Sequence, residues 1–159
     1  MFISPHEDYL KKLIPTMNAS DKKICYVTFN KGYKYLKNYF PTNGLIKDLF
    51  FIDCVNSEEQ SPNCKYISNL NLKEIAKETI KTVKQGYNFV IIDSLSNLIE
   101  KNPELYDNKI ILKKFIEDFS KIINKKEGEL LFICEKKYKE SGFIQGALNS
   151  FNVYKSSLV

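Results

Sequence analysis

The chain has 159 residues and a mass of 18.5 kDa, with 43% apolar and 27% charged residues. This length and composition predict one globular domain over residues 1–159 and exclude a disordered chain or a small disulfide scaffold. The formal net charge is +5, but every one of the 24 cationic side chains is Lys. Without Arg there is no planar fork for bidentate contacts to phosphate or guanine, so we do not expect a nucleic-acid partner.

The sequence also shows no pattern typical of a membrane span or a signal peptide. Every candidate apolar run is interrupted well before the about 18 consecutive apolar residues that a membrane span needs. Residues 1–15 lack the basic start, long apolar stretch and cleavage site of a signal peptide. We therefore expect a cytoplasmic protein that does not contact membranes.

Four short apolar runs predict the strands of a mainly parallel sheet. In chain order they are residues 24–29, 49–53, 89–93 and 130–134. Unbroken runs of this length suit strands that are buried on both faces, because helices cover both sides of a parallel sheet.

Helical patterns lie between these runs. Apolar side chains repeat every three or four residues within 72–83, where Asn71 is suited to the N-cap and Gly86 to the C-terminal stop. A second stripe predicts a helix within residues 107–126. Shorter helices are expected at residues 6–14, 31–40, 95–100 and 143–150, and loops at Pro41, Gly44 and residues 57–63. The alternation predicts a single three-layer α/β/α domain.

Polar residues at the strand ends are the candidate functional residues, because ligands bind outside the carboxyl ends of strands in such sheets. The candidate ligand-binding residues are Thr28, Asn30, Asp93 and Ser94. Asp53 and Asp93 each close an apolar run, where a carboxylate can bind a metal or transfer protons. We favour the alternative that they cap the next segment, since Asp93 and Ser94 directly precede the predicted helix at 95–100.

The cysteines do not indicate a metal site. Cys25, Cys54, Cys64 and Cys134 have no Cys-x-x-Cys spacing, and His6 is the single histidine. Most of these cysteines lie in or beside predicted strands, where a free thiol behaves as a small apolar group. We therefore assign no catalytic residue, no metal ligand and no cofactor.

The third run, extended to the sequence Phe-Val-Ile-Ile-Asp-Ser-Leu-Ser at residues 89–96, resembles the Walker B strand of RecA/KaiC-like ATPases. Residues 24–29 are similar to the strand after the P-loop helix in KaiC-like proteins. The chain most resembles archaeal KaiC-like domains of uncharacterised role, in which Lys-x-Tyr-x-Tyr-Leu precedes Phe-Phe-Ile-Asp, as at residues 31–36 and 50–53. The resemblance implies a RecA-like (P-loop NTPase-like) sheet with the order 49–52, 24–29, 89–92, 130–134, then residues 2–3 and 153–155.

The chain departs from that family where its chemistry resides. It contains no Gly-x-x-x-x-Gly-Lys-Ser/Thr segment, whose amides and Lys hold the phosphates of a nucleotide. Glu7 and Asp8 place negative charge where the triphosphate would bind. Asn30 and Lys31 stand where KaiC-like enzymes carry an acidic pair. We therefore expect neither ATP binding nor ATPase activity.

These observations favour a non-catalytic RecA/KaiC-like domain that acts through a protein partner or by self-association, as an interaction or regulatory module. The alternative is a residual nucleotide or small-ligand binder that uses the crevice at the strand ends. An enzyme centred on Asp53, Asp93 and Glu135 is a further hypothesis, and so is a phosphoacceptor role for Asp53.

Overall fold

The computed structural model describes residues 9–56, 59, 61–68 and 70–134. Five strands form one sheet in the order β3-β2-β1-β4-β5, and every pair of neighbours is parallel. The strands are β1 (Ile24–Thr28), β2 (Leu49–Asp53), β3 (Cys64–Tyr66), β4 (Phe89–Asp93) and β5 (Glu129–Ile133). The four predicted strands and their relative order are therefore confirmed. The strands expected at 2–3 and 153–155, and the helix at 143–150, lie outside the described residues.

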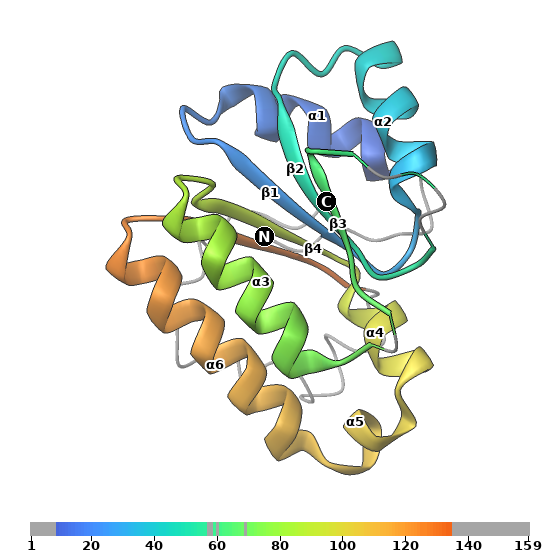
Figure 1. The fold of residues 1–159 in the computed structure, drawn as a ribbon, viewed down its shortest axis with the longest axis vertical. Coiled ribbons are helices and arrows are strands. Elements are labelled where there is room, and N and C mark those ends of the chain that lie inside the picture. Colours follow the sequence, from blue (N-terminus) through green and yellow to red (C-terminus); the bar gives the residue numbers. More distant parts are fainter. Residues whose placement is uncertain (1–8, 57–58, 60, 69, 135–159) are drawn as a thin grey trace.

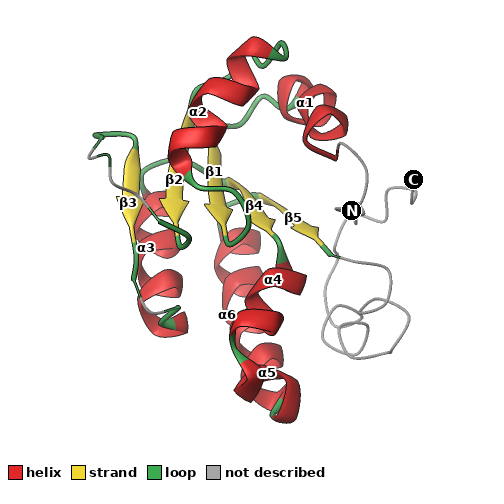
Figure 2. Cartoon of the chain, turned by 90° about the vertical axis from the view of Figure 1, so that its right-hand side faces the viewer, coloured by secondary structure: helices red, strands yellow, loops and turns green. Residues whose placement is uncertain are grey.

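Helices cover both faces of this sheet, as predicted (Figures 1 and 2). One face carries α1 (Tyr9–Ala19) and α2 (Tyr33–Thr42). The other face carries α3 (Leu72–Lys84), α4 (Leu95–Lys101), α5 (Pro103–Asp107) and α6 (Lys109–Lys125). The two-residue period of a strand divides the side chains of β1 between two apolar cores: Tyr26 packs with α1 and α2, while Cys25 and Val27 pack with the opposite layer. The three-layer α/β/α architecture is confirmed.

The ends of α3 follow the predicted capping pattern. The Asn71 Oδ1 accepts hydrogen bonds from the backbone N–H groups of Lys73 at 3.1 Å and Glu74 at 3.2 Å. After the helix the chain turns at Gly86, whose φ of +100° is in the left-handed region that glycine adopts without strain. Both ends of α3 could therefore be predicted from single residues.

The bounds of α1 and α2 correct the sequence-based prediction. A helix over 6–14 was expected to end before Pro15, but α1 continues to Ala19. Proline removes one hydrogen bond to the carbonyl of Lys11. The fully buried Met17 lies beyond it, and the apolar contact of that side chain offsets the loss. Likewise α2 spans 33–42 rather than 31–40, so Pro41 lies in its last turn and not in a loop.

Two further elements differ from the prediction. The expected helix at 107–126 is preceded by a separate short helix, α5, which starts with Pro103 at its first position. The strand β3 was not predicted at all. Lys65 and Tyr66 are exposed, and only three residues pair with β2 at the sheet edge. A short edge strand of this kind has no apolar run to mark it.

The order in which successive strands are added to the sheet reverses between β1 and β4. After β1 the chain moves outward to β2 and β3, and then returns through α3 to β4 on the other side of β1. The carboxyl ends of β1 and β4 therefore lie side by side at a topological switch point, where parallel α/β sheets place their ligands. No helix in the described ranges has the length and apolar character required to cross a lipid bilayer.

Candidate functional site

Asp93, the last residue of β4, is fully buried at this switch point. Its Oδ2 accepts a hydrogen bond of 2.6 Å from the hydroxyl of Tyr26 on β1. The hydroxyl of Tyr9 on α1 lies 3.0 Å from Oδ1 and 2.9 Å from Oδ2. The carboxylate is therefore held from the neighbouring strand and from a helix more than 80 residues earlier in the chain.

Asp93, Tyr26 and Tyr9 form a tyrosine cluster whose protonation is governed by burial. Burial raises the pKa of Asp93 to about 6, while the hydrogen bonds from Tyr26 and Tyr9 and the charge of Lys31 act in the opposite direction. The pKa values of Tyr9 and Tyr26 rise, first because they are buried and then because a carboxylate lies beside them. Both phenols therefore remain protonated donors over the neutral pH range.

The turn after β1 completes the surroundings of Tyr9. The Asn30 Nδ2 donates to the Tyr9 hydroxyl oxygen at 2.7 Å. The Thr28 hydroxyl donates to the carbonyl of Lys31 at 2.7 Å and accepts from the Asn30 N–H at 3.3 Å. Thr28 thus closes its own turn, and Asn30 orients Tyr9. From α4, the Lys101 Nζ donates to the Phe29 carbonyl at 2.9 Å.

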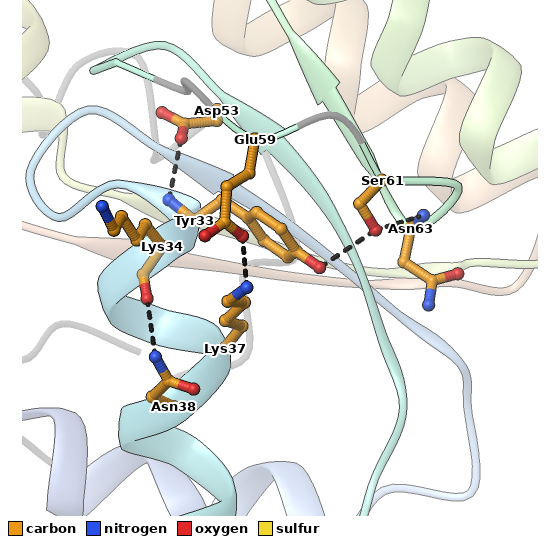
Figure 3. Close-up of polar contacts among 8 residues, drawn as sticks. All are labelled: Tyr33, Lys34, Lys37, Asn38, Asp53, Glu59, Ser61 and Asn63. Carbon is orange, nitrogen blue, oxygen red and sulfur yellow. Dashed lines mark hydrogen bonds and ion pairs between the residues drawn. The ribbon is translucent and has the colours of Figure 1, made fainter.

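Ser94 and Asp53 are capping residues. The Ser94 hydroxyl accepts from the N–H of Asn97 at 3.2 Å and forms the predicted N-cap of α4. Asp53 is fully buried, and its Oδ1 accepts from the Val55 N–H at 2.8 Å. Its Oδ2 accepts from the Tyr33 N–H at 2.7 Å (Figure 3), so it also caps α2, which precedes it in the chain.

The four residues predicted from the sequence, Thr28, Asn30, Asp93 and Ser94, do lie together at the carboxyl ends of β1 and β4. Thr28 and Asp93 are partners in the strand register. Each of the four side chains nevertheless forms a hydrogen bond within the protein, in a turn, a helix cap or the tyrosine cluster. The described part of the chain also contains no group of three His, Cys, Asp or Glu side chains suited to a metal ion.

The two tyrosines that hold Asp93 were not predicted from the sequence. Tyr26 had a usable signal, because it lies two residues before Thr28 and so shares its face of the strand. A phenol there can reach the carboxylate that ends the adjacent strand. Tyr9 had none, since only tertiary packing brings α1 to the carboxyl end of β4.

A second feature lies on the exposed side of α2, away from the cluster of Tyr9, Tyr26 and Asp93. The loop after β2 is tied to this helix by the Tyr33 hydroxyl, which contacts the Ser61 Oγ at 3.0 Å, and by the ion pair between Lys37 and Glu59 (Figure 3). Beside these contacts is a groove of about 670 Å³. Its lining includes Lys34, Tyr35, Asn38, Tyr39, Thr42 and Asn56.

The arrangement of strands and helices defines a three-layer α/β domain with a parallel five-stranded sheet. A scan of protein-family models, a search of curated proteins and a search of solved structures each found no match to the chain.

Proposed function

We propose that this chain is a non-catalytic RecA/KaiC-like domain that acts as a protein-interaction module. The observation that carries the proposal is the environment of Asp93. By its resemblance to RecA/KaiC-like ATPases, this residue occupies the position of the acid on the magnesium side of the nucleotide. Here it has no solvent exposure, and both of its oxygens accept hydrogen bonds from tyrosine hydroxyls.

Such a carboxylate does not fit a nucleotide-bound magnesium ion. A Mg²⁺ ion keeps several water molecules and needs an oxygen that faces them. To supply that oxygen, Asp93 would have to give up hydrogen bonds from Tyr26 or Tyr9. Each phenol left buried without an acceptor would cost about 1–3 kcal/mol. The sequence also lacks the Gly-rich loop that would hold the phosphates.

The apolar cores of the fold do not depend on nucleotide chemistry, which is compatible with a role in binding. The two apolar cores are built from the strands and from the helices on each face. Asp53 and Asp93 fix secondary-structure elements in place rather than facing solvent. What the domain presents to other molecules is its helical surface, on which α2 exposes Tyr35 and partly exposes Tyr39.

The strand order favours a second candidate function, a small-ligand site at the switch point between β1 and β4. Lys31 and Lys101 would supply positive charge there. We rank this function lower, because Asn30 and Thr28 already use their side chains in the β1–α2 turn and the tyrosine cluster. A ligand would have to displace those internal hydrogen bonds.

Two measurements on the full chain test the proposal. Phosphate release from Mg-ATP should equal that of buffer, and turnover that disappears in Asp93→Asn would contradict the non-catalytic role. Sedimentation over a range of protein concentrations, combined with affinity capture from native extract, should reveal either self-association or a stoichiometric protein partner. A chain that remains monomeric and captures no stoichiometric partner would contradict the interaction role.

A further inference from the structure

We infer that the groove on α2 binds an extended, acidic segment of a partner protein. This inference rests on the proposed function and assigns it a surface and a class of ligand. The groove is formed by the side of α2 opposite to Leu36 and Phe40, which are buried in the core. Asn56, in the loop after β2, lines it as well.

The dimensions suit a short extended peptide. Lys34, Tyr35, Asn38, Tyr39 and Thr42 recur at the spacing of one helix face and follow α2 almost from end to end. The 10 residues of α2 extend over about 15 Å at 1.5 Å per residue. An extended chain advances about 3.3 Å per residue, so roughly five residues can lie along the helix.

Two tyrosines supply the apolar contact area. The rings of Tyr35 and Tyr39 stack with centroids 5.5 Å apart and an interplanar angle of 22°. Tyr39 is braced by Phe40 in an edge contact, with centroids 6.1 Å apart, whereas Tyr35 is 47% exposed. Rings that are already ordered lose little entropy on binding, which is why tyrosine is frequent among the strongest contacts of interfaces.

The charges around the groove select an acidic ligand. Lys34 lines it, and the Lys31 Nζ lies 5.4 Å from the centroid of the Tyr35 ring. No Asp or Glu is among the described lining residues. The neighbouring carboxylate of Glu59 is already paired with Lys37. Acidic side chains of a bound segment would therefore meet two lysines and, among the described lining residues, no carboxylate.

Polar groups in the groove favour a peptide over a nucleic acid. The Asn38 Nδ2 donates to the Lys34 carbonyl at 3.1 Å (Figure 3), so its Oδ1 is the atom suited to accept from a peptide N–H. Asn56 adds another carboxamide to the lining. Lys31 already lies over one face of the Tyr35 ring, where a nucleobase would have to stack.

The test uses three fluorescein-labelled pentapeptide mixtures, in which Leu and Tyr are combined with Glu, Gln or Lys. Fluorescence anisotropy should show the Glu mixture binding at least about tenfold more tightly than the Gln mixture, and the Lys mixture not binding. Lys34→Glu and Tyr35→Ala should each weaken binding by about tenfold. The controls Lys73→Glu on α3 and Tyr66→Ala on β3, also exposed side chains, should leave it within about twofold.

Several results would overturn the inference. These are equal binding of the Glu and Gln mixtures, tighter binding of an oligothymidylate than of the Glu mixture, and loss of self-association in Tyr35→Ala, which would make the occupant a second copy. If the wild type and Tyr35→Ala capture the same stoichiometric partner equally well, the groove is rejected as the binding site while the proposed function stands. ATP turnover dependent on Asp93 would reject the proposed function without affecting the peptide result.

Discussion

The Tyr26 hydroxyl on β1 lies 2.6 Å from the Asp93 Oδ2 on β4, so a buried side-chain hydrogen bond joins the two strands that flank the switch point. Just beyond the carboxyl end of β1, the Phe29 N–H also donates to the Asp93 carbonyl at 2.5 Å. Asp93 therefore has a structural role through both its side chain and its backbone, at the place where the fold would otherwise receive a ligand.

Removing the Tyr26 hydroxyl tests this role. Tyr26→Phe keeps the ring in the core but takes one donor from a buried carboxylate. The free energy of unfolding at pH 7 should fall by about 1–3 kcal/mol in urea titrations. The pKa of Asp93 should rise further, because a hydrogen bond that lowers it is lost. Tyr66→Phe, at an exposed position on β3, is the matched control and should change stability little. Equal stability of the two variants would contradict the role assigned to Tyr26.

Asp93 should make stability depend on pH. Its pKa in the folded protein is about 6, above the ordinary aspartate value of 3.8 that applies to the unfolded chain. The folded state therefore binds the proton more tightly, and this contribution to stability is complete below pH 3.8 and is lost as the pH rises through 6. A difference of about two pKa units corresponds to roughly 3 kcal/mol.

Unfolding of the wild type and of Asp93→Asn between pH 4 and pH 8 measures that contribution. The stability of the wild type relative to the variant should decline across this range, because only the wild type loses the proton. Parallel pH profiles for the two proteins would show that the Asp93 carboxyl is not perturbed in the fold.

The core between the sheet and α1–α2 should be sensitive to truncation at Ile91. This side chain is fully buried in the middle of β4. Ile91→Ala should lower the free energy of unfolding by about 2–5 kcal/mol, because it removes apolar contacts and leaves a cavity. Ile110 on α6 is 76% exposed, and Ile110→Ala should cost less than about 0.5 kcal/mol. A loss at Ile91 no larger than that at Ile110 would contradict the placement of β4.

Capping by Asp53 gives a residue-specific prediction. Asp53→Ala removes the acceptor for the backbone N–H groups of Tyr33 and Val55, and should cost about 2–4 kcal/mol. Hydrogen exchange should accelerate at those two amides in particular. Asn71→Ala at the N-cap of α3 should cost about 1 kcal/mol and leave the Tyr33 amide unchanged. Unaltered exchange at Tyr33 in Asp53→Ala would rule out this cap.

Most of the sheet was predictable because four of its five strands are apolar runs with largely buried side chains. Burial on both faces produces such runs, and single residues such as Asn71 mark helix ends through their own hydrogen bonds. The edge strand β3 escaped prediction because its exposed residues, Lys65 and Tyr66, produce no such run.

The position of the candidate site could be predicted from the sequence, but the hydrogen bonds that hold Asp93 could not. Strand ends could be located, and Thr28, Asn30, Asp93 and Ser94 do lie together. The cap formed by Ser94 was predicted, but the hydrogen bonds that Asp93 accepts could not be, because Tyr9 reaches Asp93 only through packing of α1 on the sheet. The helix predicted over residues 6–14 also ended before Pro15, whereas α1 continues to Ala19, so the prediction understated that packing.

Isothermal titration of the full chain with Mg-ATP tests the central claim most directly. Affinity for a triphosphate derives mainly from the amides and Lys of a Gly-rich loop, and magnesium requires an accessible carboxylate. With Asp93 held by Tyr9 and Tyr26, we expect no binding heat into the millimolar range. A micromolar Kd that is lost in Asp93→Asn would contradict this account and would place a functional nucleotide site at the carboxyl end of β4.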